Sequence, residues 1–138
     1  MKIKNFILLK FIFIFIFLIN SNEAKTEGCD TTVSSSLTSQ LECTDDDTLN
    51  VTINGSVIKT GADTIHAKSH SDVTIDNKGT ISASTNQAIN MQHAVNTTVT
   101  NSGTIEATLR NAILMDGNNA DNNTINNSGT LKAGKKQV

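Results

Sequence analysis

A unit of about 24 residues recurs along this chain, and this period constrains the fold more than any other feature. Three copies of the unit share the run Asn-x-Gly-Thr-Ile/Leu-x-Ala, at 77–83, 101–107 and 127–133. One glycine in each unit marks the register, with two equal steps and a slightly longer third one, at Gly55, Gly79, Gly103 and Gly129. A fixed period in this range indicates stacked units that each contact only their neighbours. The sequence therefore predicts a solenoid.

Within each unit, apolar residues alternate with polar ones, which is the periodicity of a β-strand with one buried face. The positions that we expect to point inward are Ile75, Val99 and Ile125, then Ile81, Ile105 and Leu131, and then Ala83, Ala107 and Ala133. We predict an all-β fold, a right-handed parallel β-helix of about four short coils centred on the four glycines. Three short strands per coil would stack on the next coil at a spacing of about 4.8 Å.

Asparagine precedes the glycine by two residues in three of the units, at Asn77, Asn101 and Asn127. A sharp corner between short strands favours positive φ angles, which glycine and asparagine tolerate, so we predict such a corner at each Asn-x-Gly. Stacked asparagines can also form a hydrogen-bonded ladder along the solenoid. Comparison of the units places two extra residues in the loop 116–122 and two missing residues in the first corner, at 51–55.

Residues 1–24 have the pattern of a secretory signal peptide. Lys2, Lys4 and Lys10 give the positive start, and the apolar run 6–19 is followed by small and polar residues up to Ala24. This run is shorter than the roughly 20 residues that a helix needs to cross a bilayer. We predict cleavage after Ala24 and export through the inner membrane to the periplasm, the cell surface or the medium. An uncleaved N-terminal anchor is the alternative.

Two cysteines, Cys29 and Cys43, lie in the part of the chain that follows the signal. An even number of cysteines in an exported chain predicts a disulfide, and two free structural thiols are the alternative. Closing this loop would remove unfolded-chain entropy worth about 3 kcal/mol. We divide the chain into a signal peptide, a cap segment with the disulfide, β-helical repeats and a tail, at 1–24, 25–50, 51–134 and 135–138.

The composition favours a thin layered fold and argues against a nucleic-acid partner. All five Phe lie between Phe6 and Phe17, and the chain has no Trp, Tyr or Pro. A compact core of this size normally uses aromatic side chains, so regularly spaced Ile, Val, Leu, Ala and Met favour stacked β-strands instead. The net charge is −2 and there is no basic stripe, so we expect no binding to nucleic acid.

Several polar groups have the chemistry of a metal site but lack its spacing. His66 and His70 would point to one side of a strand about 13 Å apart, which is too far for one metal ion. The loop 116–121 offers oxygen ligands for Ca²⁺ without a bidentate Glu, and 45–47 is a second acidic cluster. We expect ordinary surface histidines and turns at these places, with no metal and no cofactor.

Catalytic groups are also sparse. Carbohydrate-active enzymes need a pair of carboxylates on one face, and Asp72, Asp76 and Glu106 form no repeated pair. The outward positions include two columns of threonine, which suggest an ice-binding array: Thr74, Thr98 and Thr124, and Thr80, Thr104 and Thr130. The neighbouring outward column holds Ser82, Glu106 and Lys132, so no regular array of two columns results. We therefore predict that the chain is not an enzyme.

The run Asn-x-Gly-Thr-Ile-x-Ala, followed by an Ala-Ile pair, resembles the passenger domains of autotransporters, the type V secreted proteins of Gram-negative bacteria. A signal peptide followed closely by a short Cys-to-Cys segment, here Cys29 to Cys43, is similar to the start of many such passengers. The resemblance covers residues 1–134. It implies a β-helical passenger followed by a β-barrel in the outer membrane. Because the sequence stops at Val138 without such a barrel, we expect an N-terminal fragment, which is a truncated product, part of a longer gene or a stand-alone remnant.

These observations lead to one expected function and to alternatives from other classes. We expect a non-catalytic, secreted or surface-displayed β-helix that acts as a stalk or an adhesin-type scaffold. The main alternative is a module whose loops bind a glycan or Ca²⁺, and a polysaccharide-active enzyme is a further alternative. The expected partners are an outer-membrane translocator outside this chain and a second copy that pairs with the uncapped C-terminal strand edge near Lys132.

Overall fold

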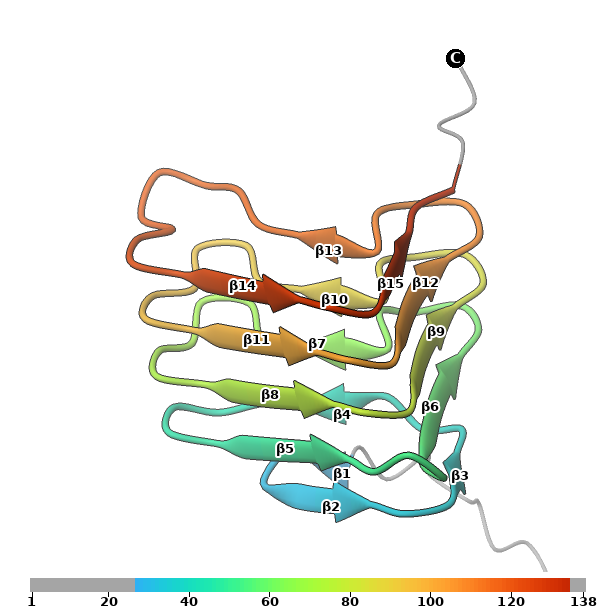
Figure 1. Cartoon of the computed structure of the whole chain (residues 1–138). Helices are drawn as coiled ribbons and strands as arrows, with labels where there is room; N and C mark the ends of the chain where they lie inside the picture. The colour runs from blue at the N-terminus through green and yellow to red at the C-terminus, as the bar shows by residue number, and fades with distance from the viewer. Residues whose placement is uncertain (1–26, 135–138) are drawn as a thin grey trace, which may run out of the picture.

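The computed structural model describes residues 27–134, which form a parallel β-solenoid (Figure 1). Three sheets of five strands each run along the solenoid, in the orders β1-β4-β7-β10-β13, β2-β5-β8-β11-β14 and β3-β6-β9-β12-β15. Strands at the front run to the right and strands at the back run to the left while the chain climbs, so the winding is right-handed. The predicted fold class, an all-β parallel helix of about four turns, is confirmed.

Each turn contributes one strand to each sheet, and we call three consecutive strands a layer. The first sheet holds β1 (Glu27–Gly28), β4 (Leu41–Glu42), β7 (Ile65–His66), β10 (Ile89–Asn90) and β13 (Ile113–Leu114). The second sheet holds β2 (Thr31–Val33), β5 (Thr48–Val51), β8 (Thr74–Asn77), β11 (Thr98–Asn101) and β14 (Thr124–Asn127). The third sheet holds β3 (Ser36–Leu37), β6 (Ser56–Lys59), β9 (Thr80–Ala83), β12 (Thr104–Ala107) and β15 (Thr130–Lys132).

The first layer is much smaller than the layers that follow it. Glu27 pairs with Leu41, whereas Leu41 pairs with Ile65, so the first turn is little more than half as long as the next one. The loop between β13 and β14 holds the two extra residues that the sequence predicted. The segment 25–50, which was predicted to be a cap, contains β1 to β4 of the solenoid itself, and its boundary falls inside β5.

The core consists of columns in which similar side chains stack on one another. Ile75 stacks on Val99 and Ile81 stacks on Ile105, and all four side chains are fully buried, as their strand positions predict. Each side chain meets its equivalent in the next layer, so aliphatic groups alone fill the interior at high density. This arrangement explains how residues 27–134 build a core without a single aromatic side chain.

The register at the first corner differs from the prediction. Val51 pairs with Asn77, whereas the glycine series had placed it opposite Ile75. The corner 52–55 therefore holds two residues more than the corner between β8 and β9, and the two missing residues fall in the loop before β5. Leu49 and Val51 are both apolar and lie two residues apart, so alternation alone does not decide which of them pairs with Ile75.

The corner glycines are needed for a different reason from the predicted one. Among the described residues, glycines with positive φ occur only at Gly61 and Gly117, so the Asn-x-Gly corners do not use the left-handed region. A Cβ atom at Gly103 would overlap the carbonyl oxygen of Gly79 and lie 2.7 Å from the carbonyl carbon of Lys78. Glycine therefore serves here to let the backbones of two layers approach closely.

The left-handed residues lie instead in the loops that lead into the second sheet. Asp72, Asn96 and Asn122 have φ angles of 60°, 55° and 54°, at equivalent places before β8, β11 and β14. Asp and Asn adopt this region more readily than other residues with a side chain. Their spacing follows the repeat and is visible in the sequence, but the prediction had assigned positive φ to the Asn-x-Gly corners.

Candidate functional site

A ladder of asparagine side chains runs along one corner of the solenoid. Asn77 Nδ2 donates a hydrogen bond of 2.7 Å to Asn101 Oδ1, and Asn101 Nδ2 donates one of 2.7 Å to Asn127 Oδ1. The same nitrogen atoms donate to the carbonyl oxygens of Thr104 at 3.0 Å and Thr130 at 3.2 Å. Asn77 and Asn101 are fully buried. These amides therefore hold one layer to the next and present nothing to a ligand.

We expect Asn101→Ala to lower the free energy of unfolding by about 2 kcal/mol. The change removes the acceptor of the buried Asn77 Nδ2 and the donor to Asn127 Oδ1 and to the Thr130 carbonyl, so side-chain contacts across three layers are lost. Urea unfolding followed by far-UV circular dichroism gives the measurement, because the chain has no Trp or Tyr. Thr100→Ala changes an exposed residue of the same strand and is the matched control. Equal losses in the two variants would contradict a role for the ladder.

The predicted disulfide between Cys29 and Cys43 is confirmed. Cys29 follows β1 and Cys43 follows β4, and these two strands are paired, so the bond joins the first layer to the second. Both cysteines are buried and belong to the same core cluster as Leu41 and Ala67. A buried disulfide of this kind stabilises the end of the solenoid and is shielded from reductants.

The two histidines that lie four residues apart meet different partners. His66 Nδ1 lies 2.7 Å from Glu42 Oε2, and His70 Nδ1 lies 3.1 Å from Asp45 Oδ1. Each histidine thus contacts a carboxylate of the preceding layer and not the other histidine. A hydrogen bond from the backbone of Ser71 and a second one from His70 lower the pKa of the Asp45 carboxyl from its ordinary value. Both contacts link neighbouring layers at the surface.

The acidic loops use their carboxylates in hydrogen bonds that shape the loops. Asp116 Oδ1 accepts a hydrogen bond of 2.8 Å from Gln92 Nε2, and Asp121 Oδ1 accepts one of 2.8 Å from the backbone N–H of the next residue. Asp47 Oδ2 accepts one of 2.7 Å from the backbone N–H of Thr44. Within residues 27–134, no group of three or more His, Cys, Asp or Glu side chains is placed to hold a metal ion.

The carboxylates considered as catalytic groups each contact a separate partner. The pairs are Asp72 with Asn96 at 3.1 Å, Asp76 with Lys78 at 2.7 Å and Glu106 with Lys132 at 3.6 Å. Glu106 also accepts a hydrogen bond of 3.3 Å from Ser82, its neighbour in the same outward column. These contacts tie the side chains to their own surroundings and bring no two of the three carboxylates together.

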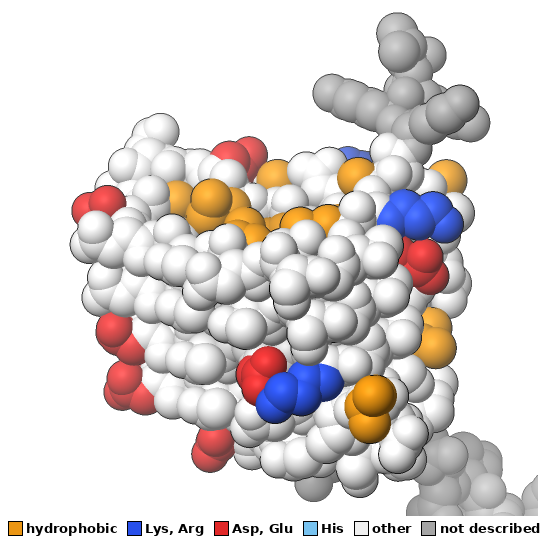
Figure 2. Space-filling model, viewed as in Figure 1, with side chains coloured by type: hydrophobic (Ala, Val, Ile, Leu, Met, Phe, Trp, Pro, Cys, Tyr) orange, Lys and Arg blue, Asp and Glu red, His pale blue; other side chains and the backbone are white. Residues whose placement is uncertain are grey.

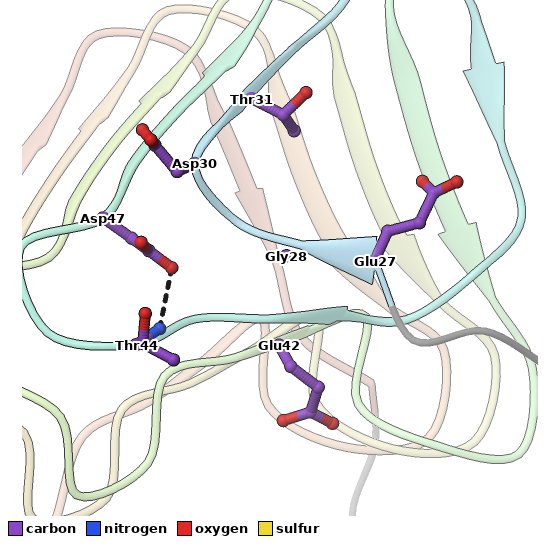
Figure 3. Close-up of a pocket in the computed structure, with 7 residues that line it drawn as sticks. All are labelled: Glu27, Gly28, Asp30, Thr31, Glu42, Thr44 and Asp47. Atoms are coloured by element: carbon purple, nitrogen blue, oxygen red, sulfur yellow. Dashed lines mark hydrogen bonds between the residues drawn. The ribbon is translucent and has the colours of Figure 1, made fainter.

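An open depression of about 480 Å³ lies at the N-terminal end of the solenoid, beside β1 and β4 (Figure 3). Its lining includes four acidic residues, Glu27, Asp30, Glu42 and Asp47. Figure 3 shows the carboxylates of Glu27 and Glu42 pointing away from each other, on opposite sides of the paired strands. The depression is therefore an acidic surface whose carboxylates do not converge on one point.

The last layer exposes apolar side chains whose equivalents are buried elsewhere. Ile125, Leu131 and Met115 are 37 %, 41 % and 45 % exposed, and we call these three residues the end face. One layer earlier the equivalent residues are fully buried, at Val99, Ile105 and Met91. Ile125, Leu131 and Ala133 were predicted to point into the core; all three are exposed, because no described residue covers this layer. Figure 2 shows hydrophobic side chains gathered at this upper end.

No helix in the part of the chain that the structure describes is long and apolar enough to cross a membrane. The predicted signal peptide at 1–24 and the predicted tail at 135–138 lie outside the described residues. Comparison of the chain with family models, with curated proteins and with solved structures finds no match.

Proposed function

We propose that this chain is an exported, non-catalytic scaffold, a stalk- or adhesin-type piece of an autotransporter-like passenger. The observation that carries the proposal is that the inward positions repeat while part of the outer surface varies. The recurring buried residues are those that hold the layers together, namely asparagines, corner glycines and aliphatic columns. Outward columns hold threonine, which favours strands, or change in charge from layer to layer, as in Ser82, Glu106 and Lys132. Repeated buried positions with a variable outer surface are what we expect of a rod-shaped scaffold.

Two further observations support export. The Cys29–Cys43 disulfide belongs to a type that forms and persists in oxidising compartments. The pattern of residues 1–24 supports passage through the inner membrane. The resemblance to autotransporter passengers adds a translocator in the outer membrane as the expected partner, with the cell surface or the medium as the destination.

The proposal is tested by expressing the whole chain in a Gram-negative host and locating it in cell fractions. We expect it outside the cytoplasm, with Lys25 as its N-terminus by mass spectrometry and with no free thiol. Lys2→Glu together with Lys4→Glu should hold it in the cytoplasm, because an export signal needs its positive start. Lys135→Glu together with Lys136→Glu makes the same change in charge at the other end and is the control. Wild-type chain that stays in the cytoplasm with reduced cysteines contradicts export.

A loop-based binding module is the second candidate, and the acidic depression at the N-terminal end favours it. Four acidic residues are among those that line one opening there. Titration calorimetry with Ca²⁺ separates the candidates, since heat that Asp30→Asn abolishes supports the binding module. Asp76→Asn alters a carboxylate that is already paired with Lys78 and is the control. No heat beyond that of dilution supports the scaffold.

A further inference from the structure

We propose that the contact between the second layer (β4 to β6) and the third layer (β7 to β9) responds to pH and is tighter in mildly acidic than in neutral solution. Two histidines of the third layer each face a carboxylate of the second. His66 Nδ1 lies 2.7 Å from Glu42 Oε2. His70 Nδ1 lies 3.1 Å from Asp45 Oδ1. Histidine is the side chain that ordinarily gains its charge between about pH 8 and pH 5, so protonation turns each of the two contacts into an ion pair.

Both contacts belong to one stretch of the boundary between these layers, which we call the joint and which consists of residues 41–47 and 64–71. The joint is also crossed by three backbone hydrogen bonds, from the N–H groups of Leu41, Cys43 and Asp46 to the carbonyl oxygens of Thr64, His66 and Ser71, at 3.0 Å, 2.9 Å and 3.1 Å. Asp45 Oδ1 accepts a further hydrogen bond of 2.9 Å from the Ser71 N–H. The histidine contacts therefore lie among the bonds that hold the two layers together, and a change in their strength acts on the whole joint.

The joint helps to attach the disulfide-closed end of the solenoid. Cys43 lies in the joint and is bonded to Cys29 of the first turn. Cys43 is also buried in the same core cluster as Ala67 of the third layer. Together with the pairing of β5 with β8 and of β6 with β9, the joint holds the first two layers to the rest of the protein. The pH of the surroundings therefore acts on how firmly the N-terminal end is attached.

The contacts at the next two boundaries use amide side chains instead. Asn96 Nδ2 donates a hydrogen bond of 3.1 Å to Asp72 Oδ1. Gln92 Nε2 donates one of 2.8 Å to Asp116 Oδ1. An amide side chain does not gain a proton between neutral and mildly acidic pH, so these contacts stay as they are. Within residues 27–134, the ion pairs that include a histidine occur only at the joint.

Each of the two histidines has an acidic residue on one side and an uncharged residue on the other. β10 presents Asn90 to His66. The segment after β10 presents Val95, whose N–H donates to the carbonyl oxygen of His70 at 3.1 Å. The other titratable residues in and next to the joint are Asp46, Asp47, Asp63, Lys68, Asp72 and, on the layer above, His93. A protonated histidine of the joint therefore meets a carboxylate from the layer below and an uncharged residue from the layer above.

The contribution of the ion pairs is present at mildly acidic pH and is lost as the pH rises. Free histidine is protonated below about pH 6.5, whereas free Asp and Glu become neutral below about pH 4. Between these values both partners are charged, and a charge-assisted hydrogen bond is about twice as strong as a neutral one. The backbone N–H of Ser71, together with His70, lowers the pKa of the Asp45 carboxyl, so this carboxylate keeps its charge at the acidic end of the range.

Amide hydrogen exchange followed by NMR tests the proposal on the joint itself, because the N–H groups of Leu41, Cys43 and Asp46 exchange when the joint opens. We expect their protection factors to rise about 5-fold in the wild-type chain between about pH 7.5 and about pH 5.5. The four paired side chains are between 31 % and 63 % exposed, so each ion pair adds little alone and the two together give a rise of this size. His66→Gln together with His70→Gln should abolish the rise, because glutamine keeps a donor but gains no charge.

A second double variant and a control variant complete the experiment. Glu42→Gln together with Asp45→Asn removes the carboxylate charges but keeps both histidines, so it should abolish the rise as well. His93→Gln is the matched control and should keep the rise, since the His93 ring lies against Gly117.

Circular dichroism shows which variants are folded, and one folded double variant suffices for the comparison. A wild-type chain whose protection factors do not rise overturns the proposal, as does a rise that survives in a folded double variant. Equal loss of the rise in His93→Gln overturns it too, because the effect would then not depend on the joint.

Discussion

Gly103→Ala is expected to destabilise the solenoid by about 3 kcal/mol, near the upper end of the range for overpacking an interior. The added Cβ would overlap the carbonyl oxygen of Gly79 and lie 2.7 Å and 2.8 Å from backbone atoms of Lys78 and Gly79. These are backbone atoms, so a change of rotamer cannot make room. The two layers must separate instead, which weakens the 2.8 Å hydrogen bond from the Thr104 N–H to the Gly79 carbonyl.

Urea unfolding monitored by far-UV circular dichroism gives the free energy of unfolding of this variant. Gly28→Ala is the matched control, because its Cβ has open space and its φ is not positive. We expect the control to stay within about 0.5 kcal/mol of the wild type. If Gly103→Ala unfolds at the same urea concentration as the control, the corner has room for a side chain. That result would contradict the claim that the two layers approach too closely there for any residue but glycine.

Removal of the disulfide is expected to lower the free energy of unfolding by about 3 kcal/mol, through the entropy that the unfolded chain regains. The variant is Cys29→Ala together with Cys43→Ala, which keeps small apolar groups at two buried positions. The segment that the disulfide closes contains most of the first layer, including β2 and β3. Each of these is the end strand of its sheet and pairs with one neighbouring strand among the described residues. The loss should therefore fall on the N-terminal end of the solenoid.

Reduction provides the matched comparison for the double alanine variant. Wild-type chain unfolded in the presence of a strong reductant should approach the stability of the variant, and the variant itself should not respond to the reductant. Identical unfolding curves for the oxidised wild type and the variant would mean that the first layer is held by its strand pairing alone.

The repeat made much of the fold predictable, because equal spacing fixes which residues stack. The constant step places Ile81 on Ile105 and Asn77 on Asn101, and the structure has both contacts. The same step relates Glu42 to His66, a contact that the sequence contained but that local spacing along the strand does not reveal. Pairs of this kind are found by searching one period away and not along the strand.

The rest depended on backbone contacts between layers, which a single sequence does not contain. The stacking of Val51 on Asn77 required the length of the loop before β5, and strand alternation alone cannot measure that length. The need for glycine at the corners comes from the carbonyl groups of the preceding layer and not from local φ. Of the acidic residues that line the depression, only Asp47 stood out in the sequence, within the cluster 45–47. The directions of Glu27 and Glu42 depend on how the first turn closes.

The short first turn is followed by layers that repeat, and this arrangement affects how such a chain can change in length. The turns from β7 to β12 repeat the same contacts at a constant step, and each layer contacts only its neighbours. An in-frame duplication of one such unit within this region would insert one further layer and lengthen the rod by about 4.8 Å. The disulfide-closed turn and the layer from β13 to β15 would both be inherited unchanged, so the number of layers between them can vary while these two layers keep their chemistry.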